Sequence, residues 1–297
     1  MSLPTDILNL ILSFLQEDRT ALRVCSQSHR TLSQLAERYL YAHISIGSDG
    51  AIKSDEIQVG NKLTAILSRR PRIANYVHSF EMDMAYNSTP WDLTLSEGLL
   101  PILSSFPALT KITLSARRNC VEWGFLPENF RMGFLDSLRL PAIKSVSIIW
   151  ISSFPLSAFN GCNGVKDLTV EGWSLDDVNV TPDDTNRPLL ESFSIKCCSA
   201  RALDRLITWA PTRNLRTLEL SRLYHPSDYG KALSKSFDFL TSLNLHIGAH
   251  CAFYSVTRRF PLNFCHRLLY LSCKLRQCGY PNIFQGYTLH PSSSHAT

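Results

Sequence analysis

The chain contains 297 residues, with 30 basic and 25 acidic side chains, a formal net charge of +5 and 44% hydrophobic residues. This length predicts about two domains, and the small, unclustered positive charge does not indicate nucleic-acid binding. The nine cysteines show no disulfide framework and there is no secretory signal, so we expect reduced thiols in the cytoplasm or nucleus.

Residues 3–15 read LPTDILNLILSFL and predict a short helix. Pro4 suits the first helical turn, and Asp6 complements the positive end of the helix dipole. The helix is apolar around nearly its whole circumference, so more than one face must be covered. A membrane-spanning helix needs roughly 20 apolar residues, whereas this run stops at the charged QEDR. We therefore expect no membrane contact, and a cover made by the rest of the chain or by another protein.

Residues 20–46 read TALRVCSQSHRTLSQLAERYLYAHISI, with apolar side chains at helical spacing and a strand-like end, AHISI. They predict two more amphipathic helices, so that residues 1–46 form a small helical domain. So small a core struggles to bury its first helix, which favours a partner protein as the cover. An ordinary helical cap on the following domain is the alternative.

Together these two segments resemble the F-box of fungal F-box proteins, which has a Leu-Pro, an acidic residue and spaced Ile or Leu positions, followed by Cys-Ser, Arg, an aromatic residue and Leu-Ala. The matching residues are Leu3, Pro4, Asp6, Ile7, Ile11 and Leu15 in the first half and Cys25, Ser26, Arg30, Leu35 and Ala36 in the second. Ser28 stands where the family usually has Val, and Leu32 where it usually has Trp or Phe.

The resemblance implies a three-helix bundle that docks on a Skp-type adaptor and, through it, on a cullin-RING ubiquitin ligase. The residues expected to contact the adaptor are Leu3, Pro4, Ile7, Leu8, Ile11, Leu12 and Leu15. The departures at Ser28 and Leu32 leave open a reduced affinity for the adaptor.

Residues 47–76 predict a linker and then a helix. GSDGAIKSDEIQVG, residues 47–60, is rich in Gly and charge, whereas NKLTAILSRRPRIANY predicts a helix that ends at Pro71.

A repeated frame, L-x-x-L-x-L with any aliphatic residue allowed, organises residues 77–275. Its copies start at residues 77, 109, 143, 165, 190, 215 and 240, with a weaker copy at 268. Spacings of 20 to 29 residues are typical of leucine-rich repeats. The frame predicts an α/β fold, an irregular leucine-rich-repeat-like solenoid with a parallel sheet inside and helices outside, including helices at 200–210 and 229–237.

The pattern also departs from that of leucine-rich repeats. Of the ninth positions, normally Asn or Cys, only Cys198 fits, so we expect irregular turns. Residues 85–101 and 117–141 are predicted as insertions on the rim, either functional or simply packed, and residues 276–297 as an irregular tail.

Chemical motifs are largely missing from the sequence. It has no Gly-rich phosphate loop, no G-x-S-x-G and no H-E-x-x-H, so we expect no enzyme and no cofactor. The acidic pairs at 176–177 and 183–184 fit solvated turns. A metal site is not predicted either, because no C-x-x-C pair occurs among the candidate ligands His246, His250, Cys251, Cys265, His266, Cys273 and Cys278.

The third, fifth and seventh positions of each frame should point away from the core, onto one sheet face. This face is either a solvated surface or a site that attracts a basic segment of a target protein. The residues expected to bind such a target are the acids Glu81, Asp83, Asp167, Glu171 and Glu219, with the rim aromatics Trp173, Tyr224 and Tyr229 as anchors. The sequence thus predicts a non-catalytic substrate-recognition subunit of an SCF-type ubiquitin ligase, or alternatively a leucine-rich-repeat scaffold without ligase docking.

Overall fold

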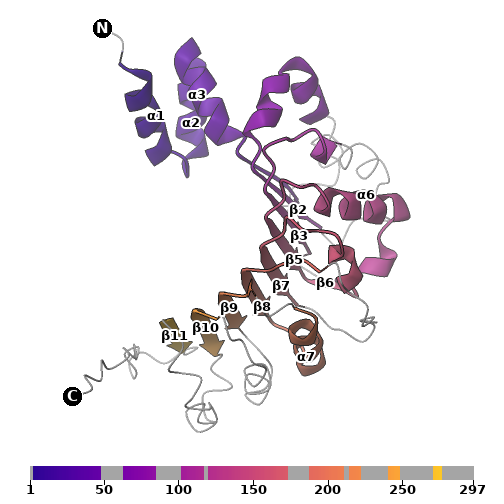
Figure 1. Cartoon of the computed structure of the whole chain (residues 1–297). Helices are drawn as coiled ribbons and strands as arrows, with labels where there is room; N and C mark the ends of the chain where they lie inside the picture. The colour runs from indigo at the N-terminus through magenta and orange to yellow at the C-terminus, as the bar shows by residue number, and fades with distance from the viewer. Residues whose placement is uncertain are drawn as a thin grey trace, which may run out of the picture. The chain divides into compact units, whose positions relative to one another are not determined.

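The computed structural model describes residues 3–47, 63–84, 102–116, 120–172, 187–210, 214–221, 240–247 and 270–275. The chain divides into two compact units. The first comprises Met1–Arg118 with Leu126–Ile143, and the second Asn119–Phe125 with Lys144–Thr297. The protein is α/β, with helices and a mostly parallel sheet (Figure 1).

The first unit opens with three helices: α1 (Thr5–Phe14), α2 (Arg19–Ser28) and α3 (Arg30–Leu40). Pro4 precedes α1 and its carbonyl accepts the amides of Ile7 and Leu8. The Asp18 carboxylate caps α2 by accepting the amide of Ala21 at 2.9 Å. The helices therefore begin at residues that satisfy otherwise unpaired backbone amides.

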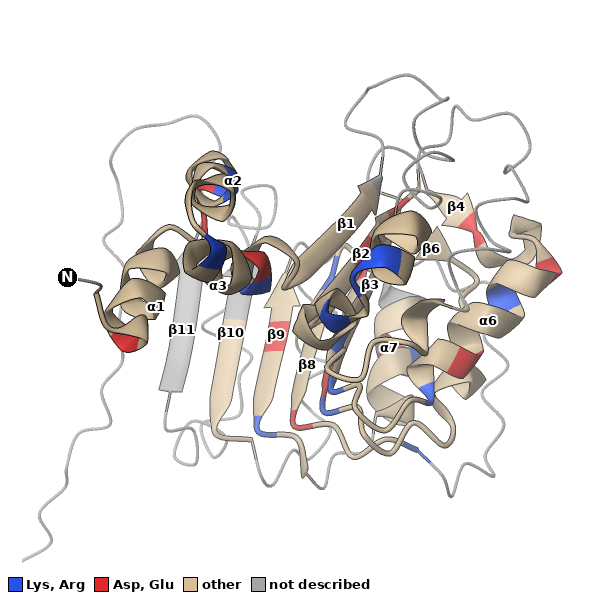
Figure 2. Ribbon diagram, turned by 90° about the horizontal axis from the view of Figure 1, so that it is seen from above, with Lys and Arg blue, Asp and Glu red and all other residues tan. Residues whose placement is uncertain are grey.

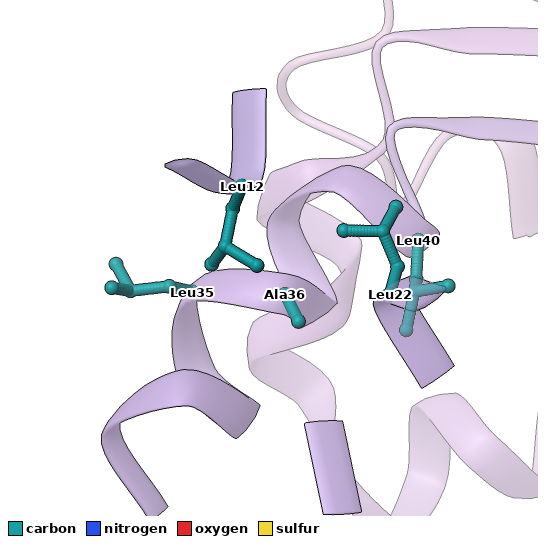
Figure 3. Close-up of a cluster of buried hydrophobic side chains, with 5 residues drawn as sticks. All are labelled: Leu12, Leu22, Leu35, Ala36 and Leu40. Carbon is teal, nitrogen blue, oxygen red and sulfur yellow. The ribbon is translucent and has the colours of Figure 1, made fainter. Parts of the chain in front are cut away.

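The three helices share one apolar core. Figure 3 shows its buried members: Leu12, Leu22, Leu35, Ala36 and Leu40. Partly buried side chains surround it: Leu8, Leu15, Cys25, Leu32, Tyr39 and Tyr41. The hydroxyl of Tyr39 also donates to the Asn9 side-chain oxygen at 3.1 Å, which links α3 to α1.

Three parallel strands belong to the first unit: β1 (His43–Gly47), β2 (Ser79–Asp83) and β3 (Lys111–Ser115), with β2 between the other two. The boundary predicted at residue 46 falls inside β1. This strand follows the repeated frame if the frame starts at Tyr41, an aromatic residue that the aliphatic frame did not admit. Residues 48–60 of the expected linker lie outside the described residues.

A buried ion pair joins α3 to the segment before β2. Residues 63–69 are helical, and the 3-10 helix η1 (Pro71–Tyr76) follows after residue 70. The helix thus ends two residues before Pro71, where the sequence predicted its end. The Glu37 side chain, 3% exposed, binds Arg70 Nη1 through Oε1 at 2.7 Å and Arg72 Nη2 through Oε2 at 2.9 Å. This contact ties the helices to the chain that enters the sheet.

The second unit contains six consecutive parallel strands in chain order: β5 (Ser145–Ile149), β7 (Asp167–Glu171), β8 (Ser192–Lys196), β9 (Thr217–Ser221), β10 (Ser242–Ile247) and β11 (Tyr270–Leu275). Each of these six strands begins at the third residue of a predicted frame, and so do β2 and β3 of the first unit. The frame therefore marks the strands correctly, including the weak copy at 268.

The aliphatic positions of the frame form the core. The first positions that the structure describes are all buried: Val77, Leu109, Ile143, Val165, Leu190, Leu215 and Leu240. The fourth and sixth positions are buried in β3, β5, β7, β8 and β9, as the two-residue period of a strand requires. Aromatic side chains fill the space beside the sheet of the second unit, where Phe159 lies 5.7 Å from Phe154 and 5.6 Å from Trp209, centroid to centroid.

Helix α7 (Ala200–Trp209) confirms the helix predicted at 200–210; the Ser199 hydroxyl caps it by accepting the Ala202 amide at 3.2 Å. The other predicted helix, 229–237, lies outside the described residues. A short 3-10 helix, η3 (Leu156–Phe159), follows the small strand β6 (Ile151–Ser152).

The second predicted insertion, 117–141, packs several of its side chains into the core, although Phe125 remains 78% exposed. It holds β4 (Val121–Glu122), which pairs with β6, then η2 (Trp123–Phe125) and α6 (Glu128–Leu138). Trp123 is buried with its ring 4.7 Å from that of Phe154, and α6 buries Phe130 and Phe134. The first insertion, 85–101, lies outside the described residues.

The turns after three neighbouring strands repeat one geometry, so the expectation of irregular turns is wrong there. The eighth residue of each frame has a positive φ: Trp150 at 58°, Gly172 at 73° and Cys197 at 52°. The backbone amide of each of these residues donates to the carbonyl of the seventh residue in the next frame. These acceptors are Glu171, Lys196 and Ser221, respectively. All three turns thus have a residue in the left-handed backbone conformation at the eighth position of the frame. This is one position before the place where leucine-rich repeats normally have Asn or Cys.

Candidate functional site

Helix α1 and Leu3 just before it expose an apolar stripe, which we call the α1 stripe: Leu3, Ile7, Leu10, Ile11 and Phe14. These side chains are 44 to 80% exposed, with Phe14 the most exposed. Residues 7, 10, 11 and 14 follow the i, i+3, i+4, i+7 spacing of one helical face. The opposite face is anchored in the helical core, so the stripe is held toward solvent.

The structure divides the residues predicted to bind an adaptor. Leu3, Pro4, Ile7 and Ile11 are exposed, whereas Leu12 is buried and Leu8 and Leu15 pack against the helical core. The prediction that Leu12 lies on the exposed face of α1 is therefore wrong. Leu10 and Phe14 lie on that exposed face but were not predicted there, although their spacing from Ile7 was available in the sequence.

The two departures from the F-box pattern lie in different environments. Ser28 is exposed at the end of α2, and its hydroxyl donates to the Cys25 carbonyl at 2.9 Å. Leu32 is partly buried against the helical core. Leu32, smaller than the Trp or Phe usual in the family, thus affects the packing among the helices. Ser28, in place of the usual Val, makes the surface of α2 more polar.

The second candidate surface is the polar sheet face, formed by the third, fifth and seventh positions of the strands. The register aligns equivalent positions across β5 to β10, so the fifth positions form one row: Ser147, Thr169, Ser194, Glu219 and Asn244. Most of these side chains are small, and Ser147 and Ser194 are buried by their neighbours. Figure 2 shows few coloured, charged positions on strands β8 to β10.

Three of the five acids proposed to bind a target already have partners within the chain. In the first unit, Glu81 lies 3.6 Å from His43 Nε2, and Asp83 accepts the Ser115 hydroxyl at 2.7 Å. In the second unit, Glu219 binds Lys196 Nζ at 3.2 Å and accepts the Ser194 hydroxyl at 2.9 Å. These internal contacts weaken their attraction for an outside cation.

Asp167 and Glu171, both on β7, are the remaining acids. Among the described residues Glu171 has no ion-pair partner. Desolvation raises the pKa of Asp167 above 3.8, and the nearby Glu191 charge raises it further, against an opposing effect of Lys166. The pKa of Glu191 is lowered by its hydrogen bond and ion pair with Lys166. Strand β7 therefore carries two of the predicted acids, Asp167 and Glu171, whereas Glu81, Asp83 and Glu219 each have a partner among the described residues.

Replacing Asp167 by Asn should raise the free energy of unfolding at pH 7, by less than about 1 kcal/mol because the carboxylate is largely exposed. Since the folded pKa of Asp167 exceeds 3.8, the parent loses stability as the pH rises from 3.8 through that value. Urea titrations between pH 3 and 7 should therefore show the advantage of the variant growing with pH. Identical pH profiles for the two proteins would contradict this explanation.

Several predicted site residues fall outside the description. Trp173, Tyr224 and Tyr229 are among them, as are most of the candidate metal ligands near the C-terminus. The backbone register places Cys273 beside Leu245 and His246 beside Lys274. Within the described residues no three His, Cys, Asp or Glu side chains are grouped to hold a metal ion. In that same part of the chain, no helix has the length and apolarity to cross a bilayer.

No protein-family model and no curated protein sequence matches this chain.

Proposed function

We propose that this chain is a non-catalytic substrate-recognition subunit of an SCF-type cullin-RING ubiquitin ligase, acting in the cytoplasm or nucleus. In this proposal α1, α2 and α3 are an F-box bundle that binds a Skp-family adaptor. The parallel strands that follow are a leucine-rich-repeat-like solenoid that binds a target protein. The proposal involves no cofactor and no nucleic acid.

The observation that carries the proposal is the α1 stripe. Isolated exposed apolar residues are normal, but a continuous helical stripe of them indicates a protein contact. The stripe lies within the segment that resembles the adaptor-binding part of an F-box. The exposed Ser28 favours a second candidate, a repeat scaffold that has lost ligase docking, because it changes the surface where the family usually has Val.

The test is a pull-down of a purified Skp-type adaptor by the full chain and by Ile11→Glu. Ile11 is 46% exposed, so a carboxylate there should leave the fold intact but bury an unpaired charge in the complex. We expect capture to fall more than tenfold. The matched control is Phe125→Glu in η2, where an apolar side chain that is 78% exposed receives the same change; it should bind like the parent.

Two outcomes would contradict ligase docking: no capture by the parent chain, or undiminished capture by Ile11→Glu. The first outcome, in a parent shown to be folded by circular dichroism, would favour the scaffold.

A further inference from the structure

An excess of positive charge surrounds Glu37, at the junction of α3 and η1. Arg70 and Arg72 bind one carboxylate oxygen each, and the guanidinium of Arg38 lies over the Tyr76 ring, 5.8 Å from its centroid. Two guanidinium groups are thus set against the Glu37 carboxylate, and α3 and η1 place a third arginine at the same junction through its contact with Tyr76. These four charged side chains together carry a net charge of +2.

The guanidinium groups keep hydrogen-bonding capacity toward solvent. An arginine has five N–H donors, and Arg70 and Arg72 each direct one terminal nitrogen to Glu37. Their side chains are 58% and 46% exposed, and Arg38 is exposed as well. The free edges of these planar groups match the two oxygens of a carboxylate.

The buried carboxylate also holds two of these arginines in place. A free arginine side chain has about 2 kcal/mol of rotamer entropy to lose when it binds. Arg70 and Arg72 have given up part of this freedom to Glu37, whose side chain is only 3% exposed. Binding of an anion to this pair therefore requires less ordering than binding to two free surface arginines.

We infer that Arg38, Arg70 and Arg72 form a docking site for an acidic protein segment with neighbouring Asp or Glu side chains. The charge is spread over two elements, α3 and η1, which suits several carboxylates along a segment better than one compact dianion. The site uses none of the α1 stripe. It is thus separate from adaptor docking and goes beyond the proposed function.

The test measures binding of a fluorescein-labelled peptide with four consecutive Glu residues to the full chain by fluorescence anisotropy. A peptide with Gln in place of Glu is the reference. We expect saturable binding of the Glu peptide, at least tenfold tighter than the Gln peptide and weakened by salt. Arg38→Gln, which leaves both Glu37 contacts in place, should weaken binding at least threefold.

A triple variant tests the arginine pair without stranding a buried charge. Glu37→Gln, Arg70→Gln and Arg72→Gln together should weaken binding more than tenfold, with the fold checked by circular dichroism. Arg216→Gln, an exposed arginine of the other unit, is the charge-matched control and should stay within twofold of the parent.

Three results would overturn the inference. They are equal affinity for the Glu and Gln peptides, unchanged binding by the folded triple variant, and at least tenfold tighter binding of a phosphoserine peptide than of the Glu peptide. The last would identify a phosphate site instead. Loss of adaptor capture in the pull-down would leave this result unaffected, because the two surfaces share no residue.

Discussion

Replacing Arg70 and Arg72 together by Gln is expected to lower the free energy of unfolding by about 3 kcal/mol, because it leaves the Glu37 carboxylate without its ionic partners. Removing one side of a buried ion pair typically costs about 3 to 5 kcal/mol. We expect the lower end, since the shorter Gln side chains allow water to reach the carboxylate. Urea denaturation of the full chain at pH 7 measures this loss.

The control adds Glu37→Gln to the same two changes. This triple variant has no buried charge at position 37, so it should recover most of the lost stability relative to the parent. If the double and triple variants were equally destabilised, the arginines would act through packing of their aliphatic stems and not through the carboxylate.

Replacing Gly172 by Ala should destabilise the second unit by about 2 to 4 kcal/mol. Gly172 has a φ of 73°, where a side chain costs about 1 to 2 kcal/mol. An added Cβ would also lie 2.4 Å from Cε3 of Trp150, and such overpacking costs about 1 to 3 kcal/mol. Thermal unfolding followed by near-ultraviolet circular dichroism would measure both effects together.

Gly161→Ala separates the two effects. Gly161 has a φ of 82°, but an added Cβ there would meet nothing within 4 Å. This variant should therefore show the backbone strain alone, about 1 to 2 kcal/mol. Equal losses for the two alanine variants would show that the Trp150 ring moves aside without cost.

The sheet could be predicted in detail because it depends on local pattern. Each copy of the frame from residue 77 onward corresponds to a strand that begins at its third residue, and its aliphatic positions are buried in the central strands. Ser147 and Ser194 are buried at polar positions, which the alternation did not predict. β1 also fits the frame, with Tyr41 at the first position, where the predicted copies have an aliphatic residue. The repeated left-handed turn was also missed, since Trp150 and Cys197 are not residue types that signal a positive φ.

The candidate surfaces were less predictable. The apolar nature of α1 was clear, but Leu, Ile and Phe occupied nearly its whole circumference. Its composition therefore did not distinguish Leu12, which is buried, from Phe14, which is 80% exposed. The sequence also did not show which acids of the polar sheet face have a partner within the chain. Glu219 is neutralised by Lys196, a neighbour only because β8 and β9 pair in register.

Sequence alone determined the α/β class, the strands of the larger sheet from β2 onward and the aliphatic residues of its core, because a strand period of two and a helical period of 3.6 are properties of the local backbone. Only the tertiary structure decided the small β4–β6 pair, which face of α1 stays open and which acids find a partner within the chain. It also brought Glu37 to Arg70 and Arg72, more than 30 residues away. Burial and ion pairing depend on residues distant in the chain, and no local period records those contacts.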